Sequence, residues 1–313
     1  MAYQLTPDQA QVAIQKMRQA IQTYFQDNNL TYAVFGKSEG LDSSVIAGLL
    51  SDLPGVKPIG VLMPIESAPE VERIARLVLD HFRISAVRVD LTPEYHALMA
   101  RFYSAGAVMD QLFGILKDYG DETLARGMVY RKSRAAGNIK VRLRMITLYH
   151  IAQLTGGIVM STDNLSELWM GFWTLNGDVG DLSPIQYVWK GLEEYTIAEA
   201  LGVPRESLEA VPTDGLDVIP GGTDQDQLGL PYAELDRVIV RLLQNRFDGT
   251  TRWPPQETDA LVAQIAGELG YSRSEVSHVA DQLCRTHFKR HWPHVVTRQE
   301  IGLPEIDSLQ VIS

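Results

Sequence analysis

Hydrophobic positions in the first half of the chain form two patterns that alternate along the sequence. Short apolar or β-branched runs of strand length lie at residues 31–35, 58–64, 85–91 and 157–161. Between these runs, apolar side chains recur every three or four residues, which is the spacing of one face of a helix. Strands that alternate with helices predict a doubly wound parallel α/β sheet, with sites at the carboxyl ends of its strands.

Signals for helix ends support this pattern. Thr6, Pro7 and Gln9 supply a hydroxyl cap, a proline in the first turn and a capping-box glutamine, so a helix is expected to run from there to about Asp27. Further helices are predicted at 70–82, from Thr92 onward, and at 138–154. Residues 103–135 combine glycines with mixed charges and predict helix fragments and a mobile loop.

The second half of the chain has helical spacing without further strand runs. Helices are predicted at 195–201, 232–244, 257–269 and 273–288, and residues 212–230 predict an ordered or mobile loop rich in Gly, Asp and Pro. We therefore expect a single domain over 1–313, with an α/β core at about 30–200 and a helical C-terminal part at about 230–313.

Composition and charge narrow the class of partner. The chain has 313 residues and a formal net charge of −11, which argues against nucleic acid or an acidic membrane surface as a partner. The only cysteine, Cys284, excludes a disulfide framework and a thiolate metal cluster, and beside Leu283 it is expected to be buried. The N-terminal residues lack the basic and apolar regions of a signal peptide, and no run of about 18 apolar residues could cross a membrane, so a cytoplasmic protein is predicted.

The loop at residues 36–44 follows the first strand run and precedes a helix. It contains two glycines, three hydroxyls and one lysine, so its backbone N–H groups and the helix N-terminus predict a phosphate site. It is not a Walker A loop, because it lacks the Gly-Lys-Ser/Thr ending of that motif. It resembles the Ser-Gly-Gly-x-Asp-Ser pyrophosphate loop of the ATP pyrophosphatases, with Glu39 in place of the first glycine. Lys37, two residues earlier, is expected to pair with Glu39.

Three further segments extend this resemblance to one family. Residues 137–145 (GNIKVRLRM) resemble the GN-(I/V)-KxRxRM helix of the NAD synthetases, and 161–184 resemble their G-T-D-x-x-E…G-(F/Y)-x-T…GD…D…P segment. Residues 287–290 (HFKR) resemble the terminal Lys-Arg pair of that family. The four motifs lie in consistent order, and the chain is identified as resembling the ammonia-dependent NAD synthetases of the N-type ATP pyrophosphatase superfamily.

The resemblance implies a reaction and its partners. Such enzymes use ATP to adenylate the nicotinate carboxylate of deamido-NAD, and ammonia then displaces AMP to give NAD. ATP as co-substrate, Mg²⁺ as cofactor and a homodimer are implied. Because the synthetase motifs account for nearly the whole length, no nitrilase-type glutaminase part is expected, and the nitrogen donor is free ammonia or ammonia from a separate partner.

The resemblance also implies roles for individual residues. Expected ATP contacts are Gly36, Ser38, Gly40, Leu41, Asp42, Ser43, Ser44, Thr162, Lys190 and Thr213. Expected Mg²⁺ ligands are Asp42 and Glu167, and expected deamido-NAD contacts are Arg142, Asp181 and Lys289. Lys190 is expected to reach the ATP phosphates, and Asp178 to orient or deprotonate ammonia.

Simpler interpretations of these residues stay open. Asp42 is equally consistent with a helix N-cap, and Glu167 with a carboxylate that is favourable at a helix start. Arg142 and Arg144 are consistent with a solvated helix face. The aromatic residues Trp169, Phe172 and Trp173 fit a hydrophobic core better than a stacking platform.

Two other functions also remain open from the sequence. Glu39, together with Leu175 where relatives have a lysine, is consistent with a nucleotide-binding homologue of weakened catalysis. The loop alone is also consistent with another pyrophosphate-loop ligase or a sulfur-transfer enzyme that acts on a different acceptor.

Overall fold

The computed structural model describes residues 3–104, 108–213, 215–216, 218–219, 221–250, 253–293 and 295. Its sheet contains four parallel strands in the order β3-β2-β1-β4, namely β1 (Tyr32–Gly36), β2 (Lys57–Leu62), β3 (Ser85–Arg88) and β4 (Ile158–Val159). Strand β1 is central: Gly36 pairs with Val61 of β2, and Ala33 pairs with Ile158 of β4. The predicted doubly wound α/β class is confirmed.

The edge strands are shorter than their apolar runs predict. Strand β4 stops at Val159, where the carboxylate of Asp181 accepts the backbone N–H at 2.8 Å in place of a strand carbonyl. Beyond it, the N–H of Met160 still bonds to Val34 O of β1 at 2.8 Å, and Met160 forms an isolated bridge with Leu182. The chain therefore leaves the sheet early and turns into the polar segment that follows.

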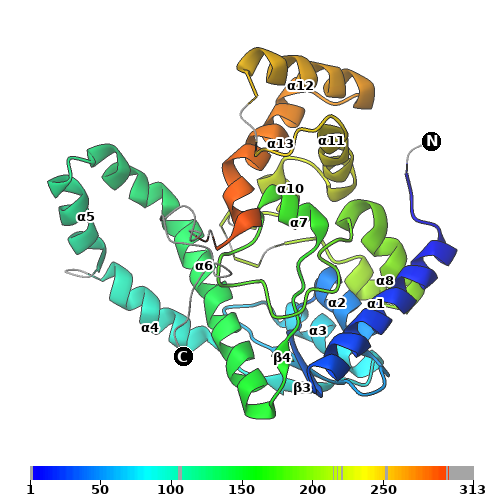
Figure 1. The fold of residues 1–313 in the computed structure, drawn as a ribbon. Coiled ribbons are helices and arrows are strands. Elements are labelled where there is room, and N and C mark those ends of the chain that lie inside the picture. Colours follow the sequence, from blue (N-terminus) through cyan, green and yellow to red (C-terminus); the bar gives the residue numbers. More distant parts are fainter. Residues whose placement is uncertain are drawn as a thin grey trace, which may run out of the picture.

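Helices cover both faces of the sheet (Figure 1). One face packs on α1 (Pro7–Asp27), α2 (Leu41–Leu50), α3 (Pro69–His81) and α8 (Tyr195–Leu201). The other face packs on α4 (Thr92–Tyr103) and on α6 (Glu122–Thr155). Alternation along β1 divides the strand, because Ala33 and Phe35 belong to the first cluster and Val34 to the second. The predicted capping box of Thr6 and Gln9 begins α1, as expected.

The helices predicted at 103–135 are present, but the last of them is not a fragment, and the predicted mobile loop stays a prediction. Apart from residues 105–107, which lie outside the description, the segment contains α5 (Val108–Asp118) and the first half of α6, a continuous helix of 34 residues. Gly137 lies inside α6 where a Cβ would come 2.9 Å from the Cβ of Leu216, so a close packing contact compensates for the poor helix propensity of glycine. Figure 1 shows α4, α5 and the start of α6 projecting from the core as an arm.

A second group of helices encloses its own apolar cluster. It consists of α7 (Leu165–Met170), α10 (Asp224–Leu228), α11 (Tyr232–Gln244), α12 (Pro255–Leu269) and α13 (Arg273–Thr286), after which the chain continues as a 3₁₀ turn, η2 (His287–His291). Helix α11 has the predicted bounds, whereas α10 lies in the segment predicted as a loop. The part of the predicted C-terminal region after residue 295 lies outside the description.

Two short helices connect the core to this group. They are α9 (Arg205–Leu208) and η1 (Lys190–Glu194), and η1 is a π-helical turn. Cys284 is exposed, so the prediction that it is buried is wrong. The buried stripe of α13 runs through Val276, Val279, Ala280 and Leu283, and the next residue turns toward solvent. Among the described helices, none combines the length and apolar character that a membrane crossing requires.

Candidate active site

A cavity of about 1000 Å³ lies where the carboxyl ends of the strands face the second helical group. Its lining comes from the loop after β1, the ends of β2 and β4, helices α6, α7 and α13, and the segment before α10. Segments that are far apart in the sequence therefore meet at one edge of the sheet. This is the location that a doubly wound parallel sheet predicts for a ligand.

The loop after β1 presents its backbone at the start of helix α2. Gly40 is the N-cap residue, with φ −66° and no side-chain cap. Within the loop, the Ser43 hydroxyl accepts the N–H of Ser38 at 3.3 Å, and the Ser38 hydroxyl accepts the N–H of Gly40 at 3.1 Å. Asp42 lies in the first turn, so its interpretation as the N-cap is wrong. The hydroxyls and N–H groups form a compact polar pocket at the positive end of α2.

Lys37 lies underneath this loop rather than in the cavity mouth. Its side chain is buried, and its ammonium group donates to Ser38 O, to Ser43 Oγ at 3.0 Å and to Ser44 Oγ at 2.8 Å. Burial lowers the pKa of Lys37 to about 7, although Glu39 and Asp42 act in the opposite direction. The expected pairing of Lys37 with Glu39 is wrong, because the ammonium group is held by the serines.

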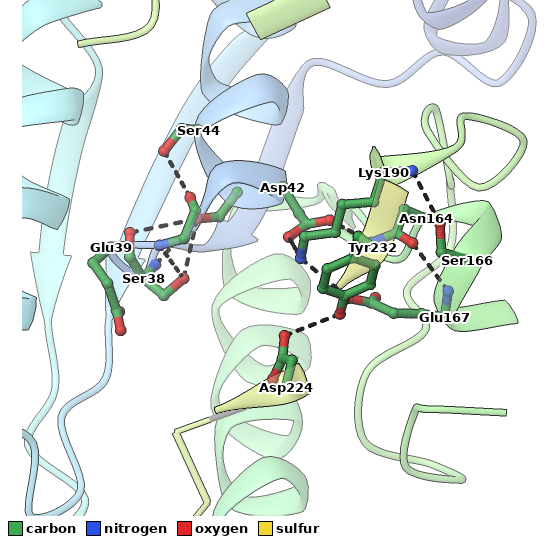
Figure 2. A network of polar contacts seen from close by, with 12 residues as sticks. Ser38, Glu39, Asp42, Ser44, Asn164, Ser166, Glu167, Lys190, Asp224 and Tyr232 are labelled. Carbon is green, nitrogen blue, oxygen red and sulfur yellow. Dashed lines mark hydrogen bonds and ion pairs between the residues drawn. The ribbon is translucent and has the colours of Figure 1, made fainter. Parts of the chain in front are cut away.

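Glu39 fits the loop without backbone strain. It is not among the non-glycine residues with positive φ, so the position does not require glycine for its conformation. Its carbonyl accepts the hydroxyl of Ser207 at 2.8 Å, and Figure 2 shows its carboxylate pointing away from Asp42 and Lys190. Across the cavity, burial lowers the pKa of Arg144, while the charges of Glu39 and Asp178 act against that shift.

Opposite the loop, one lysine joins two carboxylates. The Nζ atom of Lys190 lies 2.7 Å from Asp42 Oδ2 and 3.4 Å from Glu167 Oε1 (Figure 2). Burial alone would lower the pKa of Lys190, but the charge of Asp42 and its neighbours raises it well above its usual range. Burial likewise works against ionisation of Asp42, yet Lys190 and Asn164 hold the pKa of that carboxyl below its usual range.

Asn164 links the two acidic residues of this group, through the carboxylate of Asp42 and the backbone of Glu167. As the N-cap of α7, its side-chain oxygen accepts the N–H of Glu167 at 3.0 Å, while its nitrogen donates to Asp42 Oδ1 at 2.6 Å. The Tyr232 hydroxyl also reaches Glu167 at 3.3 Å. Burial raises the pKa of Glu167 well above its usual range, and the charge of Lys190 opposes this shift only in part. Glu167 therefore lies at a helix start, as predicted, and also faces the site.

A second polar group lies further along the cavity. Asp178 accepts the N–H of Thr174, and Lys289 donates to Gly171 O at 2.6 Å and to Trp173 O. Burial raises the pKa of Asp178 to about 6, and burial lowers the pKa of Lys289 to about 8. The Lys289 ammonium group also lies 5.0 Å from the centre of the Trp173 ring. Trp173 thus lines the cavity instead of belonging only to the core.

Most of the predicted site residues meet in this cavity. Its lining includes Gly36, Ser38, Gly40, Leu41, Asp42, Ser43, Thr162, Glu167, Asp178, Lys190, Thr213 and Lys289. Ser44 is buried behind the loop, where its hydroxyl donates to Gly40 O at 2.8 Å. Arg142 and Asp181 are not lining residues: Arg142 is exposed and donates to Leu175 O, and Asp181 accepts from Tyr149. Their roles stay predictions.

The donor set beside the loop suits a hard cation. Asp42 and Glu167 offer carboxylate oxygens on either side of the Lys190 ammonium group, so a positive charge is already accommodated between them. No group of three or more His, Cys, Asp or Glu side chains that could hold a metal is present in the described ranges. A metal here would take its remaining ligands from nucleotide phosphates and water, as Mg²⁺ commonly does.

Several residues of the site were not predicted from the sequence. Asn164, Asp224 and Tyr232 complete the hydrogen-bonded group around Glu167, and Lys37 supports the loop from below. Asn164 lies inside the quoted 161–184 motif. Its position directly before a helix, where asparagine is a favoured N-cap, was the sequence signal that could have identified it. Asp224 and Tyr232 depend on packing between distant segments, for which the sequence gives no local pattern, and the burial of Lys37 depends on the three-dimensional course of its loop.

The fold and the cavity define an α/β nucleotide-binding protein, with a phosphate-binding loop at a helix N-terminus opposed by a lysine and two carboxylates. A family model described as NAD synthase matches residues 13–293. The chain belongs to the NAD synthase family. The family that the four sequence motifs predict is therefore confirmed.

Individual relatives agree with the family match. The chain is 37% identical over 213 residues to the NH(3)-dependent NAD(+) synthetase of Finegoldia magna, covering 68% of this chain and 77% of that protein. It is 29% identical over 288 residues to the protein of the same name from Pyrococcus furiosus, covering 91% of this chain and 93% of that protein.

Solved structures share the fold. The NH3-dependent NAD synthetase of Campylobacter jejuni, in complex with nitrate, has a TM-score of 0.65 at 19% identity and covers 92% of this chain and 99% of that one. The NMN synthetase of Francisella tularensis has a TM-score of 0.67 at 23% identity, and the match covers 92% of this chain and 98% of that one. At these identities the likeness concerns the fold.

Proposed function

We propose that this chain is an NH3-dependent NAD synthetase, a ligase that amidates the nicotinate carboxylate of deamido-NAD with ammonia and converts ATP to AMP and pyrophosphate. The family match and the names of its relatives support this activity, and the family uses ATP. The observation that carries the proposal is the position of Lys190 between Asp42 and Glu167, opposite the phosphate loop in one large cavity.

In the first step, a carboxylate oxygen of deamido-NAD attacks the α-phosphorus of ATP, and the bond to the β-phosphate breaks. An acyl-adenylate forms and pyrophosphate leaves. Negative charge builds on the departing pyrophosphate, so the N–H groups of the 36–44 loop and the N-terminus of α2 bind it. Lys190 stays protonated because its pKa is raised, and it neutralises charge on the phosphates.

Asp42 and Glu167 are proposed to hold Mg²⁺, which would supply charge neutralisation at the phosphates. The two carboxylates already share one cation, the ammonium group of Lys190, at 2.7 and 3.4 Å. Asn164 keeps both in place through one side chain, which binds Asp42 and the backbone of Glu167. The donor chemistry and this shared orientation support the assignment.

In the second step, ammonia attacks the acyl carbon of the adenylate and AMP leaves. Asp178 is proposed to orient ammonia and to accept a proton from it. With a pKa of about 6, this carboxyl group is mostly ionised at neutral pH and is a stronger base than an ordinary aspartate. Lys289 is proposed to bind deamido-NAD from the same end of the cavity, where its charge favours an anionic substrate.

We further propose a homodimer. Arg142 and Ile146 lie one turn apart on α6, and the Ile146 side chain is 67% exposed. Leu154, two turns further along, is 73% exposed, and Tyr149 between them binds Asp181 at 3.0 Å. The two predicted deamido-NAD contacts outside the cavity therefore border an exposed apolar face, and a second copy of the chain is the proposed occupant. The predicted cytoplasmic location stays a prediction.

A coupled assay tests the proposed activity. Purified protein with deamido-NAD, ATP, Mg²⁺ and ammonium is expected to form NAD, which alcohol dehydrogenase converts to NADH for detection by absorbance. Omission of ammonium gives the blank, and mass measurement by light scattering tests the dimer. Folded protein that yields no NAD would overturn the proposal, and Glu39→Gly in the same assay would then separate a weakened homologue from a different reaction.

A further inference from the structure

Lys190 and a second ionisable residue share one π-helical turn. Turn η1 contains Lys190 first and Glu194 last, and the N–H of Glu194 bonds to Trp189 O at 3.0 Å, which is the i to i+5 pattern of a π-helix. Such turns are rare and are often found at functional sites. The wide turn places the side chains of Lys190 and Glu194 on the same side of the backbone.

Glu194 is a buried carboxyl group to which no N–H or hydroxyl group of the described residues donates. Its side chain is 0% exposed, and neither Oε1 nor Oε2 accepts such a bond. Burial raises the pKa of Glu194 well above its usual range, and the charge of Asp42 and a hydrogen bond between the two carboxyl groups act in the same direction, so Glu194 borders the carboxylate–lysine group. A carboxyl group left this way is costly in either protonation state, and an ammonium group is the partner that it lacks.

The neighbouring glutamate shows that partners are available on this turn. Glu193 binds the N–H of Trp189 at 2.9 Å through one oxygen and the hydroxyl of Tyr3 at 2.7 Å through the other. Glu193 is therefore satisfied away from the cavity, whereas Glu194 is buried next to it. A fully buried carboxyl group that lies against a second carboxyl group and receives no N–H or hydroxyl indicates a role that this state of the site does not use.

We propose that Glu194 is a positioning residue for Lys190: it receives the ammonium group when Asp42 and Glu167 turn to a metal ion. In the structure, Lys190 occupies the carboxylates that the proposed function assigns to Mg²⁺. The metal and the ammonium group compete for the same oxygens, so Lys190 must leave when the metal binds. Glu194 gives it a buried partner close to the phosphate loop, and this inference rests on the proposed metal site.

The test is a double-mutant cycle on metal affinity, with free Mn²⁺ measured by electron paramagnetic resonance in the absence of nucleotide. In the wild-type background, Glu194→Gln is expected to weaken Mn²⁺ binding about tenfold, because the ammonium group then stays on Asp42. In a Lys190→Met background, no competitor remains and the same change is expected to alter the affinity less than about twofold. Glu193→Gln, on the same turn, is the matched control and leaves the affinity unchanged.

Each other outcome overturns the inference. Equal weakening in both backgrounds makes Glu194 a direct contact to the metal, and no weakening in either removes its role. Thermal unfolding of metal-free Glu194→Gln is the second measurement. A lower Tm than wild type, or failure to fold, makes Glu194 a structural partner. An unchanged or higher Tm agrees with a carboxyl group to which no N–H or hydroxyl donates. Wild-type protein that binds no Mn²⁺ either with or without nucleotide, or binds it equally after Asp42→Asn, refutes the metal site itself.

Discussion

Replacement of Lys37 tests the electrostatics of the phosphate loop. The substitution Lys37→Met keeps an unbranched side chain in the buried space and removes the ammonium group beneath the loop. The hydroxyls that it contacts keep other partners, since Ser43 and Ser44 also donate to Gly40 O, at 3.2 and 2.8 Å. The variant is therefore expected to fold, and its stability relative to wild type reports the charge at position 37.

The size of the stability difference between wild type and Lys37→Met follows from the lowered pKa of Lys37. Burial lowers the pKa of Lys37 to about 7, whereas an unfolded lysine titrates near 10.4. Between these values the unfolded chain binds more protons than the native protein, so wild-type stability rises with pH through this window. Integration from about pH 7 to about pH 9 gives about 2 kcal/mol of added stability for wild type relative to Lys37→Met.

Urea unfolding at the two pH values measures this difference. Other groups titrate in both proteins, so their contributions cancel in the comparison. Lys57→Met removes an exposed lysine at the start of β2 and serves as the control for the loss of a lysine side chain. A difference for Lys37→Met that does not change with pH would refute the buried, partly neutral lysine.

Three further predictions concern the cavity and its frame. Asp42→Asn is expected to lower kcat/KM by about a thousandfold or more with an unchanged circular dichroism spectrum, and activity near wild type would contradict its role. Glu39→Gln removes a negative charge from the phosphate loop, and since a solvent-screened charge pair is worth about 1 kcal/mol, KM for ATP should fall about fivefold; an unchanged KM places the carboxylate too far away to matter. Gly191→Ala places a Cβ 2.2 Å from the backbone nitrogen of Ala233 and should cost about 3 kcal/mol or more in urea unfolding, unlike Gly267→Ala, where nothing lies within 4 Å.

The sequence predicted what local rules determine. The capping box at Thr6 and Gln9, the bounds of α11 and the order of strands and helices all follow from patterns within a few residues. The family, the α/β class and the NAD synthetase activity are supported by the comparisons, which also decide against a different pyrophosphate-loop ligase. Motifs are local too, so most of the predicted site residues lie in the cavity lining.

Features that depend on tertiary packing were missed. Helix α6 runs through Gly127 and Gly137 although both disfavour a helix, and the packing of Leu216 against Gly137 is invisible in the sequence. Lys37 next to a loop with Glu39 suggested a surface pair, but the space beneath the loop and three oxygen acceptors decide its position. The buried carboxyl group of Glu194 likewise lies beside Asp42 and Glu167 only because α2, α7 and η1 meet.

The central claim is that the cavity forms an acyl-adenylate of deamido-NAD before ammonia reacts. Deamido-NAD labelled with ¹⁸O in its nicotinate carboxylate tests this directly, with AMP and NAD analysed by mass spectrometry after turnover with ATP, Mg²⁺ and ammonium. Because a carboxylate oxygen attacks the α-phosphorus, one ¹⁸O atom should appear in each AMP formed, in equal amount to NAD. AMP without ¹⁸O, or AMP formed without NAD, would contradict the account.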